Sequence, residues 1–254
     1  MIVIISPAKR LDFNDSAIRK QSTPLFLKDA SRLVAQLREL SAEQLQELMS
    51  VSPKIADLNA GRFKAWNRST TDKKAKQALL AFCGDVYLGL DAGTFEAKDF
   101  DFAQKHLRIL SGLYGVLKPL DMIQAYRLEM GTRLKNKQGD NLYDFWGSRI
   151  SEALAAELAE MSRSVLINLA SNEYFRSITT DCLDAQIITP VFKEKKNGVY
   201  KVISFTAKRA RGMMARYIIK NRIKKPELLK QFCDGDYRYQ AKLSTEAQWV
   251  FGRG

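Results

Sequence analysis

The chain has 254 residues, 46% of them hydrophobic, with three cysteines, one histidine and a formal net charge of +13. Such a chain can bury a substantial core, and an odd number of widely separated cysteines argues against a disulfide framework. A single histidine leaves too few ligands for the usual Cys/His zinc site, and His106 has no neighbours in the sequence that would indicate a histidine-based catalytic triad. No run of about 18 apolar residues occurs, so we expect no membrane span.

The composition favours one cytosolic domain covering residues 1–254. The cysteines are typical of reduced thiols, prolines and glycines are scattered, and no segment repeats at a fixed period. The apolar run at residues 1–5 is too short and wrongly flanked for a signal peptide. Phosphate-loop and dinucleotide fingerprints are absent, so ATP or NAD use is unsupported. We expect a monomer that holds no cofactor and no metal ion.

The first part of the chain predicts a buried strand at residues 2–5, followed by closely spaced helices. Thr23-Pro24 and Ser52-Pro53 each combine a helix N-cap with a proline at the first helical position, and residues 41–44 have the pattern of a capping box. We therefore expect three helices, over residues 23–40, 41–49 and 53–66.

Helix and strand signals then alternate. The segment 74–82 carries both signals, and we predict a short strand at its end, over residues 79–83. The expected elements that follow are a helix at 99–107, a strand or tight turn at 108–115, one amphipathic helix at 144–161 and a buried strand at 165–169.

Asn197-Gly198 separates two apolar segments, 187–192 and 199–205, which is a strong signal for a β-hairpin. After it we expect a helix over 206–222, a short helix from Pro226, and a closing hairpin built from residues 237–243 and 248–251. Alternation of helices and strands along the whole chain favours the α/β class, with a mixed sheet flanked by helices.

The helix predicted at 206–222 lies in a strongly basic segment. Between Glu194 and Glu227 there are eleven Lys and Arg residues and no acid, and these account for most of the net charge. An apolar stripe should dock this helix on the core, and it consists of Ala207, Ala210, Met214, Tyr217 and Ile218. The cations that occupy the rest of its surface are Lys208, Arg209, Arg211, Arg216, Lys220 and Arg222.

No acid lies three or four residues from these cations, so nothing within the helix neutralises them. A local positive field of this kind implies a polyanionic partner, and we expect the cations to contact DNA phosphates. The alternative is a solvated face whose cations pair with acids from other elements. The same charge would also serve an RNA-binding factor.

Three predicted strands lead into polar loops, at residues 6–10, 170–174 and 206–212. In open α/β sheets ligands bind at the carboxyl ends of parallel strands, so these loops would form one crevice if their strands are parallel. The residues expected there are Ser6, Lys9, Arg127, Glu129, Asn168, Ser171, Asn172, Glu173, Tyr174, Lys208 and Arg211. We also expect Lys9 and Arg10 to bind DNA, together with the cations of the basic helix.

Glu173 could act in this crevice as a general acid or base, with Lys9 as a perturbed amine and Arg211 beside them. Equally, Ser171 and Glu173 fit a helix N-cap followed by a first-turn acid. Arg127 and Glu129 fit either a buried structural ion pair or membership of the crevice.

Several of these segments resemble a known family. The matching motifs are ISPAK at residues 5–9, GDVY at 84–87, LSGLYGVL at 110–117, YRLEMG at 126–131, FWG at 145–147, NLAS at 168–171, EYF at 173–175, and Lys208 with ARG at 210–212. Together they resemble the bacterial YaaA family of peroxide stress resistance proteins. Arg10 and Asn172 depart from the family pattern, and the last 20 or so residues match weakly.

The resemblance implies a cytosolic protein of the hydrogen peroxide response that limits iron-dependent damage and binds DNA through a basic cleft. It also implies a helix-hairpin-helix-like element, for which residues 43–66 are the candidate and the turn at 113–117 the alternative. Our first hypothesis is a protein that binds duplex or distorted DNA largely without sequence specificity, with Tyr174 and Tyr217 stacking on exposed bases. The alternative is an enzyme acting on a nucleotide or nucleic-acid base in the Lys9/Glu173/Arg211 crevice.

Overall fold

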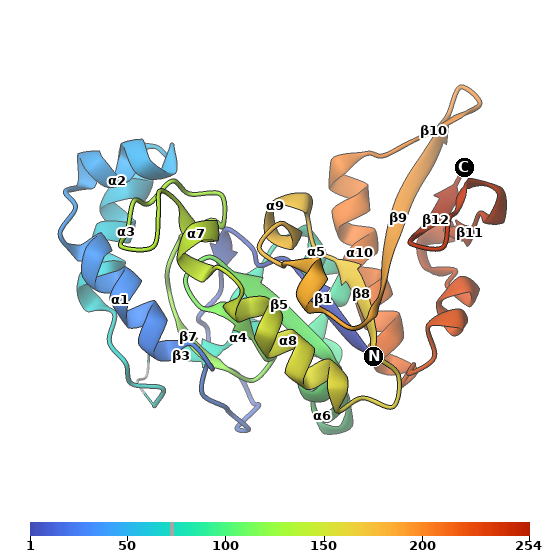
Figure 1. Cartoon of the computed structure of the whole chain (residues 1–254), viewed down its shortest axis with the longest axis horizontal. Coiled ribbons are helices and arrows are strands. Elements are labelled where there is room, and N and C mark those ends of the chain that lie inside the picture. Colours follow the sequence, from blue (N-terminus) through green and yellow to red (C-terminus); the bar gives the residue numbers. More distant parts are fainter. Residues whose placement is uncertain (72–73) are drawn as a thin grey trace.

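The computed structural model describes residues 1–71 and 74–254, and its main sheet lies at the centre of the molecule (Figure 1). The strands follow the order β11-β12-β9-β8-β1-β5-β6, and β10 pairs with β9. Their bounds are β1 Ile2–Ile5, β5 Leu107–Ser111, β6 Gly115–Leu117, β8 Val165–Leu169, β9 Gln186–Lys196, β10 Val199–Lys201, β11 Arg238–Tyr239 and β12 Gln248–Arg253.

The middle of this sheet is parallel. Strands β5, β1, β8, β9 and β12 run in one direction, whereas β6, β10 and β11 each pair antiparallel with a neighbour. All residues of β1 and β8 are buried, as expected for strands covered on both faces. The predicted α/β class with a mixed sheet is confirmed. Two small antiparallel pairs complete the strands: β2 (Arg10–Leu11) with β4 (Phe82–Cys83), and β3 (Ala75–Gln77) with β7 (Met122–Gln124).

Helices surround the sheet, and α1, α2 and α3 gather at one end of the molecule (Figure 1). The α-helices are α1 Leu27–Arg38, α2 Ala42–Met49, α3 Pro53–Ala65, α4 Ala78–Ala81, α5 Asp85–Leu90, α6 Ala97–His106, α7 Leu142–Trp146, α8 Arg149–Ala159, α9 Asn172–Phe175 and α10 Ser204–Lys220. Short 3-10 helices are η1 Ala92–Thr94, η2 Thr180–Cys182, η3 Pro226–Gln231, η4 Asp234–Asp236 and η5 Ala241–Leu243.

The local signals for α2 and α3 are confirmed. Ser41 and Gln44 form the predicted capping box, with Gln44 N donating to Ser41 Oγ and Ser41 N donating to Gln44 Oε1. Pro53 occupies the start of α3. The two helices form a hairpin in which Ser50, with φ 49°, takes the left-handed conformation that glycine often provides. Whether this pair is a helix-hairpin-helix element that binds DNA stays a prediction.

The alternative hairpin at residues 113–117 is wrong, because this turn joins strands β5 and β6 and its residues are buried. Its backbone N–H groups are therefore shielded from a phosphate. Other expectations fail at element boundaries. Helix α1 begins at Leu27 instead of Pro24, only Phe82 and Cys83 form a strand within 79–83, and η3 is a 3-10 helix. The helix expected at 144–161 is two helices, because Gly147 has φ 50° and breaks it.

The Asn-Gly hairpin is confirmed and positions α10. Asn197 and Gly198 have φ values of 50° and 80°, and this positive-φ pair suits a two-residue hairpin turn. Leu166 and Ile167 of β8 pair with residues 187 and 188, so the later part of β9 extends past the carboxyl end of β8. The returning strand β10 ends at Lys201, and α10 then runs back beside the sheet (Figure 1). The N-terminal half of α10 therefore lies at the carboxyl edge.

Candidate functional site

The loops after β1 and β8 meet at the carboxyl edge of the sheet, as expected. Ser171 N donates a hydrogen bond to Ser6 Oγ at 2.8 Å, and Ser6 Oγ donates to Ser171 Oγ at 3.3 Å. Tyr87 of α5 joins them, because its hydroxyl donates to Ser6 O at 3.1 Å. Burial raises the pKa of Tyr87 well above its usual value, which keeps this hydroxyl a donor.

Glu129 brings two cations into the crevice. Its carboxylate lies 2.8 Å from Lys9 Nζ and 3.0 Å from an Arg127 guanidinium nitrogen. The Arg127 side chain is 17% exposed, so the Arg127–Glu129 pair is largely buried and, through Lys9, also belongs to the crevice. Arg127 Nε is buried and has no hydrogen-bond partner within residues 1–71 and 74–254.

Arg62 of α3 adds further positive charge. Burial, and then repulsion from Arg127, lower the pKa of Arg62. Lys9 and Arg127 thus share the Glu129 carboxylate, and Arg62, which was not predicted from the sequence, lies close enough to Arg127 to be repelled by it. This arrangement favours an anion, because an additional negative charge would relieve the repulsion between the two guanidinium groups.

Glu173 ties α9 to a neighbouring loop. Its Oε1 accepts a hydrogen bond from Gly131 N at 3.0 Å, and its backbone carbonyl accepts one from the Tyr143 hydroxyl at 3.0 Å. Ser171 stands at the N-cap position of α9, but its hydroxyl makes no cap hydrogen bond, having turned to Ser6. In the described part of the chain, no hydrogen bond or ion pair joins Glu173 to Lys9 or Arg211.

The other residues expected in this crevice have different surroundings. Asn168 is buried and supports the loop, since its Oδ1 accepts from Ala170 N and its Nδ2 donates to Thr189 Oγ1. Asn172 is exposed, as is Arg10. Tyr174 is only 8% exposed, and burial raises its pKa, so the expectation that its ring stacks on bases is wrong.

The third polar segment, residues 206–212, was expected to be a loop that follows a strand, but it lies within helix α10. Residues 202–205 continue no strand, and Phe205 lies in the first turn of α10. Lys208 and Arg209 are exposed and form no hydrogen bond or ion pair through their side chains in the described chain. Arg211 is half-buried, and that burial lowers its pKa. The predicted apolar stripe is confirmed, with Ala207, Ala210, Met214 and Ile218 buried.

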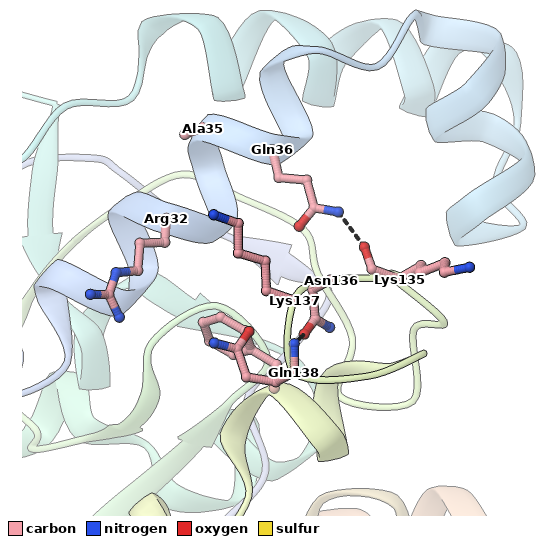
Figure 2. Close-up of a pocket in the computed structure, with 8 residues that line it drawn as sticks. Arg32, Ala35, Gln36, Lys135, Asn136, Lys137 and Gln138 are labelled. Carbon is pink, nitrogen blue, oxygen red and sulfur yellow. Dashed lines mark hydrogen bonds between the residues drawn. The ribbon is translucent and has the colours of Figure 1, made fainter.

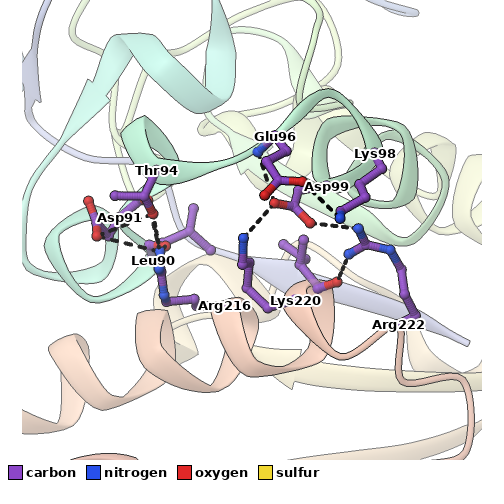
Figure 3. Close-up of polar contacts among 10 residues, drawn as sticks. Leu90, Asp91, Thr94, Glu96, Lys98, Asp99, Arg216, Lys220 and Arg222 are labelled. Carbon is purple, nitrogen blue, oxygen red and sulfur yellow. Dashed lines mark hydrogen bonds and ion pairs between the residues drawn. The ribbon is translucent and has the colours of Figure 1, made fainter.

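The C-terminal half of α10 is neutralised from outside the helix (Figure 3). Arg216 donates to Leu90 O, Asp91 O and Thr94 Oγ1, at 3.2, 3.0 and 2.7 Å. Asp99 of α6 bonds to Lys220 Nζ at 2.8 Å and to Arg222 at 2.6 Å. Arg216, Lys220 and Arg222 therefore have partners from other elements of the protein, which was the alternative to contacts with DNA phosphates.

Asp99 is a strong anchor because it is 1% exposed yet ionised. Burial alone would raise its pKa, but hydrogen bonds from Lys220, Glu96 N and Arg222 overcome this and lower the pKa to about 2. A buried carboxylate with two cationic partners stabilises the docking of α10 on α6.

The full length of the chain also matches known proteins. The sequence model of the family described as Peroxide stress protein YaaA matches residues 1–243. This chain belongs to the YaaA family. A relative from Teredinibacter turnerae is 54% identical and one from Colwellia psychrerythraea is 52% identical, each over the whole of this chain and 99% of the relative, and both are named "UPF0246 protein". The family name supports a role in the peroxide response.

Two glycines hold α10 of this YaaA-family protein against α5. A Cβ on Gly212 would lie 1.8 Å from Val86 O, and a Cβ on Gly89 would lie 2.1 Å from Arg209 O. The two helix backbones are therefore in direct contact, which only glycine permits. Because α5 also carries Tyr87, which bonds to Ser6, this crossing fixes the basic helix relative to the crevice. This helix crossing was not predicted from the sequence, although Gly212 lies in a motif shared with the family.

A cavity of about 740 Å³ lies between α1 and the loop before α7 (Figure 2). Arg32, Lys135 and Lys137 line it, together with Gln36 and Phe145. Gln36 donates a hydrogen bond to Lys135 O, and both residues also line a second cavity of about 710 Å³, which reaches Gly131. Neither cavity is lined by any of the site residues that were predicted from the sequence.

The described residues place no three His, Cys, Asp or Glu side chains together as a metal site requires. Cys83 is half-buried, and Cys182 and Cys233 are exposed and free. Within the same ranges, no helix of this YaaA-family protein is both long and apolar enough to span a bilayer.

Proposed function

We propose that this protein binds DNA in the response to hydrogen peroxide, as a cytosolic monomer, and contacts phosphates largely without reading sequence. The observation that carries the proposal is a group of exposed cations on two adjoining elements whose side chains form no hydrogen bond or ion pair within the described ranges. They are Lys208 and Arg209 of α10 and Lys195, Lys196 and Lys201 of the β9–β10 hairpin, of which Lys196 lies close enough to Glu194 to help lower its pKa. Membership of a peroxide stress family supports the cellular role.

These cations come from two adjoining elements. The hairpin ends where α10 begins, and the structure pairs Lys201 with Glu194 across the hairpin, next to the Lys195–Tyr200 pair. Glu194 itself is neutralised, because its carboxylate bonds to Arg253 at 2.8 Å. The positive charge therefore extends from the hairpin, with Lys196 and Lys201 on one face and Lys195 on the other, to the first two turns of α10. Such a surface attracts a polyanion and raises its association rate.

Contacts from lysine and arginine to phosphates position a protein on DNA but carry no sequence information. We therefore expect similar affinity for unrelated sequences. A protein bound in this way would cover part of the DNA, and we propose that this shielding limits iron-dependent oxidation.

The test is a fluorescence-anisotropy titration of two duplexes of unrelated sequence at several salt concentrations. Five phosphate contacts would give a slope of log K against log salt of about −4 to −5, equal for both duplexes. Absence of salt-dependent binding would overturn the proposal.

A second candidate is an enzyme that acts on a nucleotide or nucleic-acid base in the Lys9/Glu173/Arg211 crevice. The observation that favours it is the group of cations at the carboxyl edge, in which Lys9 and Arg127 share the Glu129 carboxylate and Arg62 is repelled by Arg127. A phosphate group would add negative charge to this group, with Lys9 on the loop after β1 and Glu173 in α9. Substitution of Glu173 separates the two candidates.

A further inference from the structure

Phe205 is an exposed aromatic residue in the first turn of α10, between Lys201 of the hairpin and Lys208 and Arg209 in the sequence; these cations, with Lys195 and Lys196, are called the basic surface. Its side chain is 58% exposed, and Val202, three residues earlier, is 53% exposed. Burying a phenylalanine is normally favourable by about 1.5–3 kcal/mol, and Phe205 leaves most of its apolar surface available to a partner beside Lys208 and Arg209. The aromatic residues expected to stack on bases are engaged elsewhere: Tyr174 is buried and Tyr217 packs on Phe232, with ring centroids 5.5 Å apart.

Phe205 shares one face of α10 with the free cations. Positions i, i+3 and i+4 of a helix lie on the same side, so Phe205 stands next to Lys208 and Arg209. Gly212 continues this face and touches α5. Phe205 lies seven residues before Gly212, about 10 Å along the helix axis, and so projects beyond the crossing with α5.

The charges around Phe205 indicate what covers it. Lys201 precedes it, Lys208 and Arg209 follow it, and Lys195 and Lys196 lie on the neighbouring hairpin. An apolar ring surrounded by cations matches the stacked bases of a nucleic acid, which offer π-faces between phosphates. An apolar protein surface would match the ring but not the cations.

We propose that Phe205 stacks on a base, or enters a base step, where the bound DNA is unpaired or distorted, while the surrounding cations hold the flanking phosphates. This inference rests on the proposed function and specifies the state of DNA that the site prefers. Apolar side chains inserted between base steps unstack them at a cost of a few kcal/mol, which is smallest where a mismatch or unpaired base has already weakened the stack.

The experiment compares the wild type with Phe205→Ala, Phe205→Trp and Leu25→Ala, a control in which an equally exposed apolar residue, 66% accessible, is removed outside the basic surface. Anisotropy titrations use a fully paired duplex and the same duplex with one unpaired 2-aminopurine, whose fluorescence reports stacking. Thermal unfolding verifies that each variant folds.

We expect the wild type to prefer the duplex with the unpaired base and to change its 2-aminopurine fluorescence. Phe205→Ala should bind that duplex about 5- to 100-fold more weakly, which is the effect of losing one base–aromatic stack. The slope of log K against log salt should not change, because no phosphate contact is removed. Phe205→Trp should retain the signal, and Leu25→Ala should match the wild type.

Equal affinity and fluorescence in the wild type and Phe205→Ala, with salt-dependent binding intact, would overturn this inference alone. Lack of DNA binding by the wild type would overturn it together with the proposed function. Self-association of the wild type that Phe205→Ala abolishes would assign the ring to a second copy of the chain and would also overturn the inference.

Discussion

Lys220 Nζ, at the last residue of α10, lies 2.8 Å from Asp99 Oδ2 of α6, and this ion pair anchors the C-terminal end of the basic helix. The C-terminal half is held to the rest of the protein by Asp99 and by the partners of Arg216. The N-terminal half, with Lys208 and Arg209, projects at the carboxyl edge of the sheet without such partners in the described chain. Substitutions in the C-terminal half of α10 should therefore change stability, whereas substitutions in its N-terminal half should change DNA binding.

Asp99→Asn should destabilise the protein by about 2–3 kcal/mol, because it leaves two partly buried cations without a counter-charge. Urea unfolding gives this value. The matched control is Asp101→Asn on the same helix, where Asp101 pairs with Lys20 at 2.6 Å but is 52% exposed. This exposed pair should contribute less than about 1 kcal/mol. Equal effects of the two substitutions would contradict the role given to Asp99.

The low pKa of Asp99 predicts that the folded protein loses stability in acid. Hydrogen bonds from its partners lower its pKa to about 2 in the folded protein, against an ordinary value of 3.8. A depressed folded-state pKa contributes stability above the unfolded pKa, and this contribution is lost as pH falls through the folded pKa. The contribution is about 2 kcal/mol. Unfolding free energies measured between pH 5 and pH 2 should therefore fall more steeply in the wild type than in Asp99→Asn, and parallel curves would count against this explanation.

Gly212→Ala should be strongly destabilising, although alanine is a better helix former. The new Cβ would lie 1.8 Å from Val86 O, so α5 and α10 must separate, and overpacking of this kind costs about 1–3 kcal/mol or more. Gly61→Ala in α3 is the control, because nothing lies within 4 Å of its Cβ and φ is not positive. That substitution should stabilise by about 0.5–1 kcal/mol. Thermal unfolding of both variants tests the helix crossing, which fails as an explanation if they behave alike.

Glu173→Gln separates the two candidate functions. Glutamine can keep the acceptor for Gly131 N, so the fold should persist, and the loss of one negative charge should leave DNA affinity equal or slightly higher. We expect survival under hydrogen peroxide to equal that of the wild type. Survival assays of a deletion strain carrying the variant provide the measurement. Lost survival with intact DNA affinity would instead support the enzyme.

The sequence predicted features that depend on neighbours in the chain. The capping box at Ser41, the Asn197-Gly198 turn and the apolar stripe of α10 are all confirmed, because their signals lie within a few residues. The meeting of Ser6 and Ser171 was also predictable, since it follows from two adjacent parallel strands.

Contacts that depend on the tertiary arrangement were not predictable. Asp99 and Lys220 are 121 residues apart, and no local pattern connects them. The same holds for Lys9 with Glu129 and for Gly89 with Gly212. Phe205 was missed for a different reason: its apolar neighbours continue the alternation of the hairpin, which made it look like the end of a strand.

The most direct test of the central claim is the salt dependence of duplex DNA binding by Lys208→Ala/Arg209→Ala compared with Lys220→Ala. Removing two phosphate contacts should reduce the slope of log K against log salt by about 2, whereas Lys220→Ala should lower stability and leave the slope unchanged. An unchanged slope in the double variant, or a reduced slope in well-folded Lys220→Ala, would contradict the assignment of DNA binding to the N-terminal half of α10.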